Sequence, residues 1–467
     1  MLGKAGQKID WLVDHYMAVC LLLALFILSM VGVGDMRAVS MLGLLLCVVG
    51  IIQQSAQVDL WIFVPLVIYD LFAMASSWAA YGNIADGYGV THLVFPTVYL
   101  LMACLSGGEQ LLLKWLCLGW AGAAAFLGVV QFTYRAAFLG SARRMGGVIG
   151  NPNAMGIFLV IGWFALRYFL EGQEGDEKGQ GHFLLSSMEP ILLAALGLTL
   201  SMGSFVAMAA GICVLIGGKK REASRARLPH PWRETLRYAQ GLLAKASLGI
   251  GWGILLYLAA ARTDVPWISL GLFGYLAALS LCWKRLGAFL DAYPWMAAAI
   301  SAGGIFVAAA AVAVRPSSLA TFAERLEMME NGLHYLVQSP LLGVGPYRWR
   351  FLNLADSDKY FNTWHIHNVL IHVGVELGWI AMAMLAVLAA RGYAKKSSLP
   401  QKGGFTAFCV HNLMDTGFFY LGIMSFTLIF AGMPGHGGKR VNGFWLKAFF
   451  GTAALIYAYG LYAGMKM

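Results

Sequence analysis

The chain has 467 residues, of which 59% are hydrophobic and only 12% are charged. Soluble globular proteins have about 25% charged residues, so this composition excludes an ordinary soluble protein and predicts a polytopic membrane protein. The formal net charge of +10 comes mostly from cations in short loops between apolar runs. No nucleic-acid-binding motif accompanies them, so we expect membrane lipids as partners and no nucleic acid.

Apolar runs recur along the whole chain and predict an all-α helix bundle, because about 20 helical residues span the core of a bilayer. We expect about 12 to 14 transmembrane helices. Two spans are expected to form a hairpin that turns at residues 200–203, and the long span 405–432, which contains His411, Asn412 and Asp415, is expected to be broken there. The expected spans are 16–33, 38–52, 60–79, 90–105, 112–133, 153–170, 183–200, 204–217, 240–261, 267–283, 293–314, 367–390, 405–432 and 443–464.

The distribution of basic residues gives the expected orientation of these spans. The segment 218–237 is rich in lysine and arginine, and cytoplasmic loops carry such an excess. The segment 315–365 then becomes a large outer loop. The expected parts of the chain are an N-terminal transmembrane bundle (1–314), the large outer loop (315–365) and C-terminal transmembrane helices (366–467).

Two loops on the outer side contain arginines, which the same rule disfavours there. A bound anion would account for them, since the planar guanidinium group matches phosphate oxygens bidentately. Pairing with acidic residues of the same loop is the alternative, and we favour it for Arg315 and Lys359. For Arg325 and Arg144 we favour a role in function. The outer cations are Arg135, Arg143, Arg144, Arg315, Arg325, Arg348, Arg350 and Lys359.

A helix is predicted inside the large outer loop. Thr321 and Glu324 have the spacing of a capping box, which predicts that the helix begins there, and Ser339-Pro340 is expected to end it. Its apolar residues share one face, so the helix should lie at the membrane surface or cover a cavity. Arg325 is about 60° from the centre of that face and can point under the helix.

The segment LLGVGPYRWRF follows this helix. Gly343 and Gly345 permit a tight turn and the close approach of a ligand to the backbone. Tyr347 lies beside Arg348, and aromatic rings next to cations suit a sugar phosphate at a membrane surface. An interfacial aromatic belt explains the aromatic residues alone equally well.

Three histidines, His365, His367 and His372, lie at the start of the next apolar run. Their spacing differs from the i, i+4 pairs of helical zinc ligands, so no metal site is expected. His367 is expected at the outer mouth of its helix, where an ionisable group is a candidate for function. Glu376 would lie about 13 Å deeper and half a turn round, so we expect it to pair inside the bundle.

Residues 143–390 resemble the O-antigen ligase and polymerase family of bacterial envelope glycosyltransferases. The resemblance rests on Arg325, the turn Pro340-Leu341-Leu342-Gly343-Val344-Gly345, then His367-Asn368 and Gly378, in this order. A second stretch, RRMGGVIGNPNAMG from Arg143, resembles the family where Asn151-Pro152-Asn153 opens a helix.

This resemblance implies an enzyme of the bacterial cytoplasmic membrane whose active site faces the periplasm or exterior. It would transfer a glycan, with inversion at C1, from a polyprenyl diphosphate such as undecaprenyl diphosphate to an acceptor hydroxyl, without metal, nucleotide or other cofactor. His367 would be the general base, and Arg325 would bind the diphosphate and stabilise the leaving group. The further donor contacts implied are Arg144, Arg143 and Arg348, and the residues that would orient the substrate are Asn368, Asn151, Asn153, Gly343, Gly345 and Tyr347.

Three acceptors fit the same catalytic residues: a lipid A-core sugar in lipopolysaccharide biosynthesis, a second lipid-linked repeat, and a protein hydroxyl. The His-Asn motif with Gly378 favours the ligase. Members of the family often carry a Ser-Arg pair at an outer tip, and Ser201-Met202-Gly203-Ser204-Phe205 lacks the arginine, which keeps the polymerase as the alternative. A transporter of a lipid-linked glycan is the rival from another class, since broken helices and the intramembrane residues His411, Asp415 and Glu376 would suit it.

Overall fold

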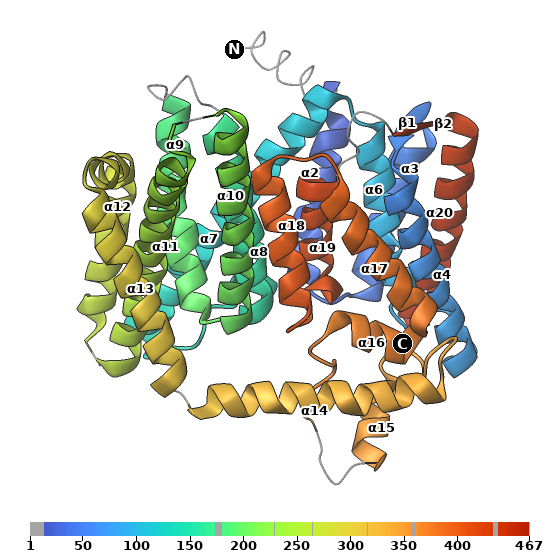
Figure 1. Cartoon of the computed structure of the whole chain (residues 1–467). Helices are drawn as coiled ribbons and strands as arrows, with labels where there is room; N and C mark the ends of the chain where they lie inside the picture. The colour runs from blue at the N-terminus through green and yellow to red at the C-terminus, as the bar shows by residue number, and fades with distance from the viewer. Residues whose placement is uncertain are drawn as a thin grey trace. The chain divides into compact units, whose positions relative to one another are not determined.

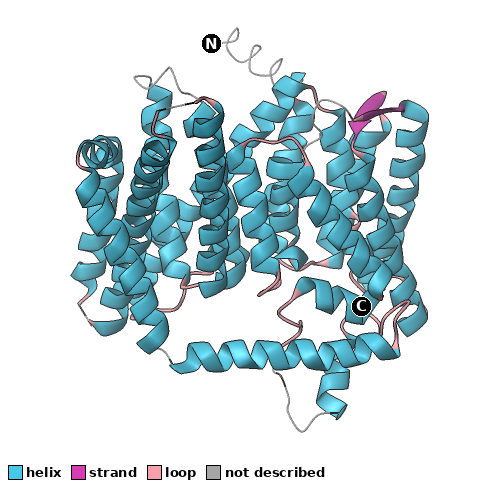
Figure 2. Ribbon diagram, viewed as in Figure 1, coloured by secondary structure: helices cyan, strands magenta, loops and turns pink. Residues whose placement is uncertain are grey.

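The computed structural model describes residues 14–172, 180–227, 229–263, 265–314, 316–356, 361, 363–432 and 438–466. Nearly all of the described elements are helices, as Figure 1 and Figure 2 show, so the expected all-α fold is confirmed. Among the described residues, eight helices are long and apolar enough to cross a bilayer, and six shorter apolar helices accompany them. The protein is therefore a multi-pass membrane protein.

The chain folds into two compact units that are each built from separate stretches of sequence. Unit 1 comprises Met1–Cys117, Glu324–Ser397 and Asn412–Met467, and unit 2 comprises Leu118–Ala323 and Ser398–His411. Three helices contribute residues to both units: α7 (Gly107–Leu139), α14 (Pro316–Gln338) and α18 (Leu399–Asn412).

Unit 1 contains apolar helices, short helices near the ends of the longer ones, and a two-stranded ribbon. Helices α3 and α20 pack closely because glycines of α3 face aromatic rings of α20. Gly43 meets Tyr457, and Gly50 meets Phe450, with no room for a Cβ at either glycine. The strands pair antiparallel, with Ser55 opposite Asn442. The elements are α2 (Tyr16–Val31), α3 (Met36–Ile51), β1 (Ser55–Val58), α4 (Leu60–Tyr81), α5 (Gly89–His92), α6 (Val94–Cys104), α15 (Arg348–Asp356), α16 (Val369–Leu377), α17 (Trp379–Ala394), η2 (Gly417–Phe419), α19 (Leu421–Thr427), η3 (Leu428–Gly432), β2 (Lys439–Asn442) and α20 (Gly443–Lys466).

Unit 2 is a bundle of long helices around α9. Gly249 and Gly253 of α11 let that helix approach α9 at Leu193 and Ala194, and Gly197 of α9 meets the backbone of Ile250. Such small residues allow helices to pack backbone against backbone in a membrane. The elements are η1 (Gly147–Ile149), α8 (Pro152–Gly172), α9 (Gln180–Thr199), α10 (Met202–Arg225), α11 (Pro231–Arg262), α12 (Pro266–Ala292) and α13 (Pro294–Val314).

Two expected breaks in the helices are confirmed. The hairpin of 183–200 and 204–217 is formed by α9 and α10, and the side chain of Ser201 caps α10 by accepting a hydrogen bond from the N–H of Ser204. The segment 405–432 is interrupted between Asn412 and η2, where the side chain of Asn412 accepts a hydrogen bond from the N–H of Phe418 at 2.7 Å. Polar side chains thus replace the helical hydrogen bonds lost at each break.

Two expected helix boundaries are wrong. The span 367–390 is divided into α16 and α17 at Gly378, whose φ of +86° ends α16, and whose neighbour Trp379 donates its N–H to the carbonyl of Pro340 at 3.0 Å. The outer helix begins at Pro316 and not at Thr321. Proline fits the first turn of a helix because its missing N–H would have no partner there.

Candidate functional site

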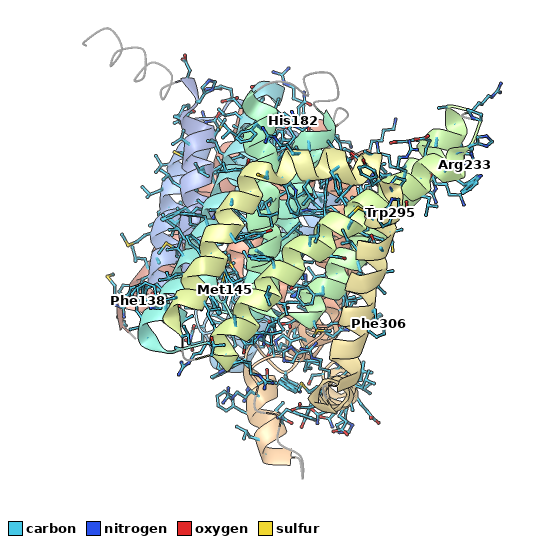
Figure 3. All side chains as sticks on the ribbon, turned by 90° about the vertical axis from the view of Figure 1, so that its left-hand side faces the viewer. Phe138, Met145, His182, Arg233, Trp295 and Phe306 are labelled. Carbon is cyan, nitrogen blue, oxygen red and sulfur yellow. The ribbon has the colours of Figure 1, made fainter. Side chains whose placement is uncertain are left out.

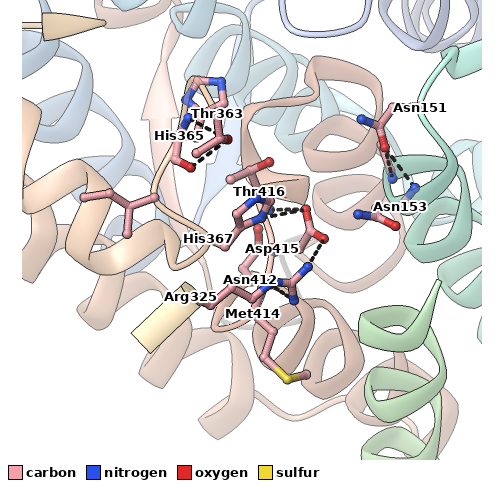
Figure 4. Close-up of polar contacts among 12 residues, drawn as sticks. Asn151, Asn153, Arg325, Thr363, His365, His367, Asn412, Met414, Asp415 and Thr416 are labelled. Carbon is pink, nitrogen blue, oxygen red and sulfur yellow. Dashed lines mark hydrogen bonds and ion pairs between the residues drawn. The ribbon is translucent and has the colours of Figure 1, made fainter. Parts of the chain in front are cut away.

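Three segments of unit 1 meet around one carboxylate. They are helix α14, which carries Arg325, the loop before α16, which carries His367, and the break after α18, which carries Asp415 (Figure 4). Arg325 and His367 were expected to act together. Their common partner, Asp415, is 90 positions from Arg325 in the chain. Helix α14 packs beside α16 through a buried cluster that includes Met328, Tyr335 and Val375.

Arg325 is held at this position by the backbone of the break. Its Nη1 donates to the carbonyl of Met414 at 2.6 Å, and its Nη2 lies 3.7 Å from Oδ2 of Asp415. The latter distance exceeds that of a hydrogen bond, so it is an ion pair without a direct N–H···O contact. The side chain of Arg325 is 20% exposed, and its Nε is buried with no hydrogen-bond partner. The guanidinium group therefore keeps N–H donors for another anion.

His367 lies on the other side of the same carboxylate. Its Nδ1 is 3.7 Å from Oδ1 of Asp415, and 23% of its side chain is exposed, whereas that of Asp415 is only 8% exposed. Oδ1 of Asp415 also accepts the N–H of Thr416 at 2.9 Å, which fixes the carboxylate. Nδ1 is therefore the ring nitrogen that faces Asp415.

Asn368 joins the histidine loop to the segment that contains Asp415. Its side-chain oxygen accepts the N–H of Ile371 at 3.1 Å and so caps α16, and its Nδ2 donates to the carbonyl of Leu413 at 3.3 Å. One side chain thus sets both the start of α16 and its distance from the break. Asn368 therefore links the loop that carries His367 to the segment that carries Asp415.

Buried polar side chains support the loop before α16, which carries His365 and His367. Nδ1 of His372 accepts the N–H of Ile366 at 3.3 Å, so its proton is on Nε2, which lies 3.0 Å from Nδ1 of His365 and 3.4 Å from Oε2 of Glu376. The hydroxyl of Tyr88 donates to the same oxygen of Glu376 at 3.1 Å. The expectation that Glu376 pairs inside the bundle is confirmed.

His365 takes part in this group of side chains as a neutral ring. Burial lowers its pKa to about 4, with a smaller effect in the same direction from His367. The ring stacks on Phe419, with 4.8 Å between the centroids. A neutral, stacked and hydrogen-bonded His365 fixes the backbone two residues before His367.

The turn 340–345 is held against α16. The N–H of Val344 donates to the carbonyl of Val375 at 2.8 Å, and that of Gly345 to the carbonyl of Glu376 at 3.1 Å. A Cβ on Gly343 would meet the backbone of Glu376, so the close approach at this glycine is made by α16 itself. The positive φ of Gly343 and Gly345 is therefore explained by packing.

Tyr347 and Arg348 lie next to this turn. Burial, followed by the nearby Glu376, raises the pKa of the Tyr347 hydroxyl, and the ring is 5.4 Å from that of Tyr88. The guanidinium group of Arg348 lies over the ring of Tyr81, 5.8 Å from its centroid. In the part of the chain that the structure describes, neither residue contacts Arg325, His367 or Asp415.

The remaining expected site residues belong to unit 2, where Arg144 reaches the tip between α9 and α10. Its Nε donates to the carbonyl of Thr199 at 2.8 Å, and its Nη2 to Oδ1 of Asn153 at 2.6 Å. Asn151 caps α8 by accepting the N–H groups of Asn153 and Ala154. Arg143 is exposed. Arg144 thus places a guanidinium group at the 199–203 tip, which has no arginine of its own.

Asp415 is the functional candidate that the sequence reasoning did not assign to this site. The signal for it was an acidic residue inside an apolar segment, which is costly unless the residue is paired or functional. That signal did not identify Arg325 as the partner. Arg325 bonds to Met414, the neighbour of Asp415, from 89 positions away in the chain.

Comparison with known protein families bears on the same region. Residues 249–386 match the family model described as O-antigen ligase. The match includes Arg325, the turn 340–345, His367 and Asn368, and it ends before Asp415. No curated protein matches the chain. The resemblance seen in the sequence is confirmed for the matched residues.

Proposed function

We propose that the protein is a membrane glycosyltransferase of the ligase type, because residues 249–386 match the family model described as O-antigen ligase. It moves a glycan from a polyprenyl-diphosphate donor to an acceptor hydroxyl at the outer face of the bacterial cytoplasmic membrane, with a lipid A-core sugar as the acceptor. The observation that carries the proposal is the carboxylate of Asp415, which lies 3.7 Å from both Arg325 and His367.

Arg325 binds the diphosphate in this proposal. One of its N–H groups is used by the carbonyl of Met414, and its contact with Asp415 is longer than a hydrogen bond, so donors remain for a phosphate oxygen. During the reaction the bond between C1 of the sugar and the phosphate oxygen breaks, and the electron pair goes to that oxygen. A fixed guanidinium group stabilises the negative charge that grows there.

His367 acts as the general base. Its Nε2 accepts the proton of the acceptor hydroxyl while the hydroxyl oxygen attacks C1, which gives inversion at that carbon. The positive imidazolium that forms is stabilised by the charge of Asp415, whose Oδ1 lies 3.7 Å from Nδ1, beyond hydrogen-bond distance. In hydrolytic triads a carboxylate beside the histidine base likewise stabilises the imidazolium. The residues themselves supply the acid–base step, and the mechanism uses no metal or nucleotide.

Arg144 is proposed as a second contact for the donor. It supplies a guanidinium group at the 199–203 tip, where related proteins often place an arginine of the tip itself. Its exposed side chain is already oriented by Thr199 and Asn153. A preset guanidinium group loses little side-chain entropy when it binds phosphate.

Polymerisation of lipid-linked repeats is the alternative activity, since the same residues could serve another acceptor. Transport is the alternative from a different class, and the interruptions at Gly378 and after Asn412 favour it, because transporters bind substrates at broken helices.

Mass analysis after incubation of proteoliposomes with a defined donor separates these activities. The donor is a polyprenyl-diphosphate oligosaccharide, offered with lipid A-core, with a second lipid-linked repeat, or alone. We expect a new glycosidic bond to lipid A-core, with unchanged yield in EDTA. Products that contain only joined repeats would identify a polymerase. Relocated donor without a new bond would identify a transporter and overturn the proposal.

A further inference from the structure

Unit 2 contains a polar cavity at the ends of its helices that carry the basic segment. Its volume is about 740 Å³, and helices α8, α9, α10, α11 and α12 line it. His182 lies at this end of the unit and Met145, next to Arg144, at the opposite end, as Figure 3 shows. The cavity is therefore separate from the tip that holds Arg144. In the expected orientation, this end of unit 2 faces the cytoplasm, because Lys219 and the basic residues that follow it lie there.

The floor of the cavity is built around a buried acid. Glu189 is 1% exposed, and its two oxygens accept hydrogen bonds from the indole N–H groups of Trp163 at 3.1 Å and Trp283 at 2.8 Å. Arg167 lies 3.9 Å from Glu189 and donates to Glu171 at 2.9 Å. Buried charges are costly unless they are paired in this way, so the floor is an ordered polar surface.

Lys245 lies on the wall of the cavity. Lys245 of α11 is half-buried, and among the described residues no carboxylate pairs with it. Its ammonium group lies beside Gly287 of α12, where a Cβ would come within 3.0 Å of Nζ. An ammonium group that lines a polar cavity and is not paired with a carboxylate can bind an anionic group.

The acids and bases of the whole lining are equal in number. Five cations and five carboxylates line the cavity, so it carries no formal net charge when histidine is neutral. Two of the carboxylates, Glu234 and Asp291, are exposed and have no ion-pair partner among the described residues. A zwitterion with a phosphate near Lys245 and an ammonium near Glu234 or Asp291 matches this distribution better than a net anion. The charged residues are Arg167, Lys219, Arg237, Lys245, Lys284, Glu171, Glu189, Glu222, Glu234 and Asp291.

Large apolar side chains are exposed on the same helices that form the cavity. Trp232, Leu236 and Phe289 are 57%, 48% and 42% exposed, and they lie within a few residues of lining positions. Exposed aromatic and aliphatic side chains at the ends of membrane helices contact lipid at the interface. A ligand held in the cavity would therefore have lipid beside it.

We propose that this cavity binds the headgroup of a zwitterionic phospholipid with a primary ammonium, of the phosphatidylethanolamine class. The phosphate meets Lys245, and the ammonium meets the carboxylates of Glu234 and Asp291. The acyl chains extend along the exposed apolar side chains of α11 and α12. The site is distinct from the candidate catalytic residues, and its test does not depend on glycosyl transfer.

The test measures lipid retained by the purified protein, by native mass spectrometry after addition of phosphatidylethanolamine or phosphatidylglycerol. We expect the wild-type protein to retain phosphatidylethanolamine in preference, and Lys245→Gln to bind it roughly tenfold more weakly, as expected for loss of one charge-assisted contact. Lys220→Gln is the matched control, because Lys220 is exposed and does not line the cavity.

A second variant fills the site without changing its charge. Gly287→Leu places a side chain against Lys245 and should also displace the lipid, whereas Gly274→Leu on the same helix has nothing within 4 Å and should not. Equal retention of phosphatidylglycerol, or equal loss in Lys245→Gln and Lys220→Gln, would overturn the proposal. If soluble phosphoethanolamine competes as well as the lipid, the proposal of a lipid ligand is overturned and the ligand is a soluble zwitterion.

Discussion

Replacement of Asp415 by asparagine tests the proposed catalytic arrangement, because it removes one charge and keeps the shape of the side chain. The asparagine oxygen can still accept the N–H of Thr416, which Asp415 accepts at 2.9 Å. The substitution therefore leaves the backbone of the break supported. What it removes is the negative charge between Arg325 and His367.

The expected magnitude follows from the distance between the charges. His367 Nδ1 lies 3.7 Å from Asp415, so a full charge pair at an effective dielectric constant of about 20 is worth about 4.5 kcal/mol. The imidazolium is only partly formed in the transition state, so the loss should be about 2 to 4 kcal/mol, or roughly 30- to 1,000-fold in kcat.

The same substitution should have the opposite effect on the donor. Asp415 also lies 3.7 Å from Arg325, where its charge opposes an incoming diphosphate. Removal of that charge should leave donor affinity unchanged or increase it. The assay is single-turnover transfer in proteoliposomes, with donor binding measured separately on the same preparation. A kcat within about threefold of the wild type, or weaker donor binding with normal thermal stability, would refute this reasoning.

Three further predictions concern the supports of the site. Asn368→Ser should keep the cap of α16 and lose the hydrogen bond to Leu413, so glycan transfer should fall while the melting temperature changes little. Asn368→Ala should in addition lower the free energy of unfolding by about 1 kcal/mol, because the cap is lost. Equal transfer activity of both variants and the wild type would exclude the positioning role. Gly378→Ala should prevent folding in detergent, because a Cβ there meets the carbonyl of Leu341 at a positive φ, whereas Gly251→Ala, with nothing within 4 Å, should behave like the wild type. The pKa of His365 is lowered to about 4 in the folded protein, so the unfolded state binds more protons between the two pKa values. The stability that this residue contributes is therefore present above the ordinary histidine pKa. It should be lost as the pH falls from that pKa towards 4. Thermal unfolding of His365→Gln should lack this part of the acid destabilisation, and pH profiles that superimpose would contradict it.

Several features of the fold could be predicted because their signals are local in the sequence. The hairpin of α9 and α10 was indicated by Ser201 and Gly203, and the break before Asp415 by polar residues in a long apolar run. The end of α14 was indicated by Pro340. In each case a side chain or proline changes the hydrogen bonding of its own neighbourhood, so the sequence around it contains the information.

Other features depend on contacts between distant segments. The division at Gly378 arises because Pro340 and Leu341 approach its backbone, and a glycine in an apolar run is otherwise compatible with a continuous helix. The proposed role of Asp415 depends on its distances to Arg325 and His367, and the hydrophobic periodicity of the sequence does not reveal these distances. A ligand was expected to approach Gly343 and Gly345, but the backbone of α16 lies against Gly343, and Ala80 and Arg348 lie against Gly345. A positive φ does not indicate which group comes close.

The pairing of Arg325 and His367 around Asp415 is the central claim, and one measurement addresses it most directly. Proteoliposomes that contain the wild type, Arg325→Ala, His367→Ala or the control His334→Ala, an exposed histidine of α14, are loaded with labelled donor, and the transferred glycan is counted in a single turnover. We expect His367→Ala to bind donor and transfer none of it, Arg325→Ala to lose donor binding and transfer, and His334→Ala to match the wild type. Substantial transfer by the His367→Ala protein would contradict the proposed mechanism.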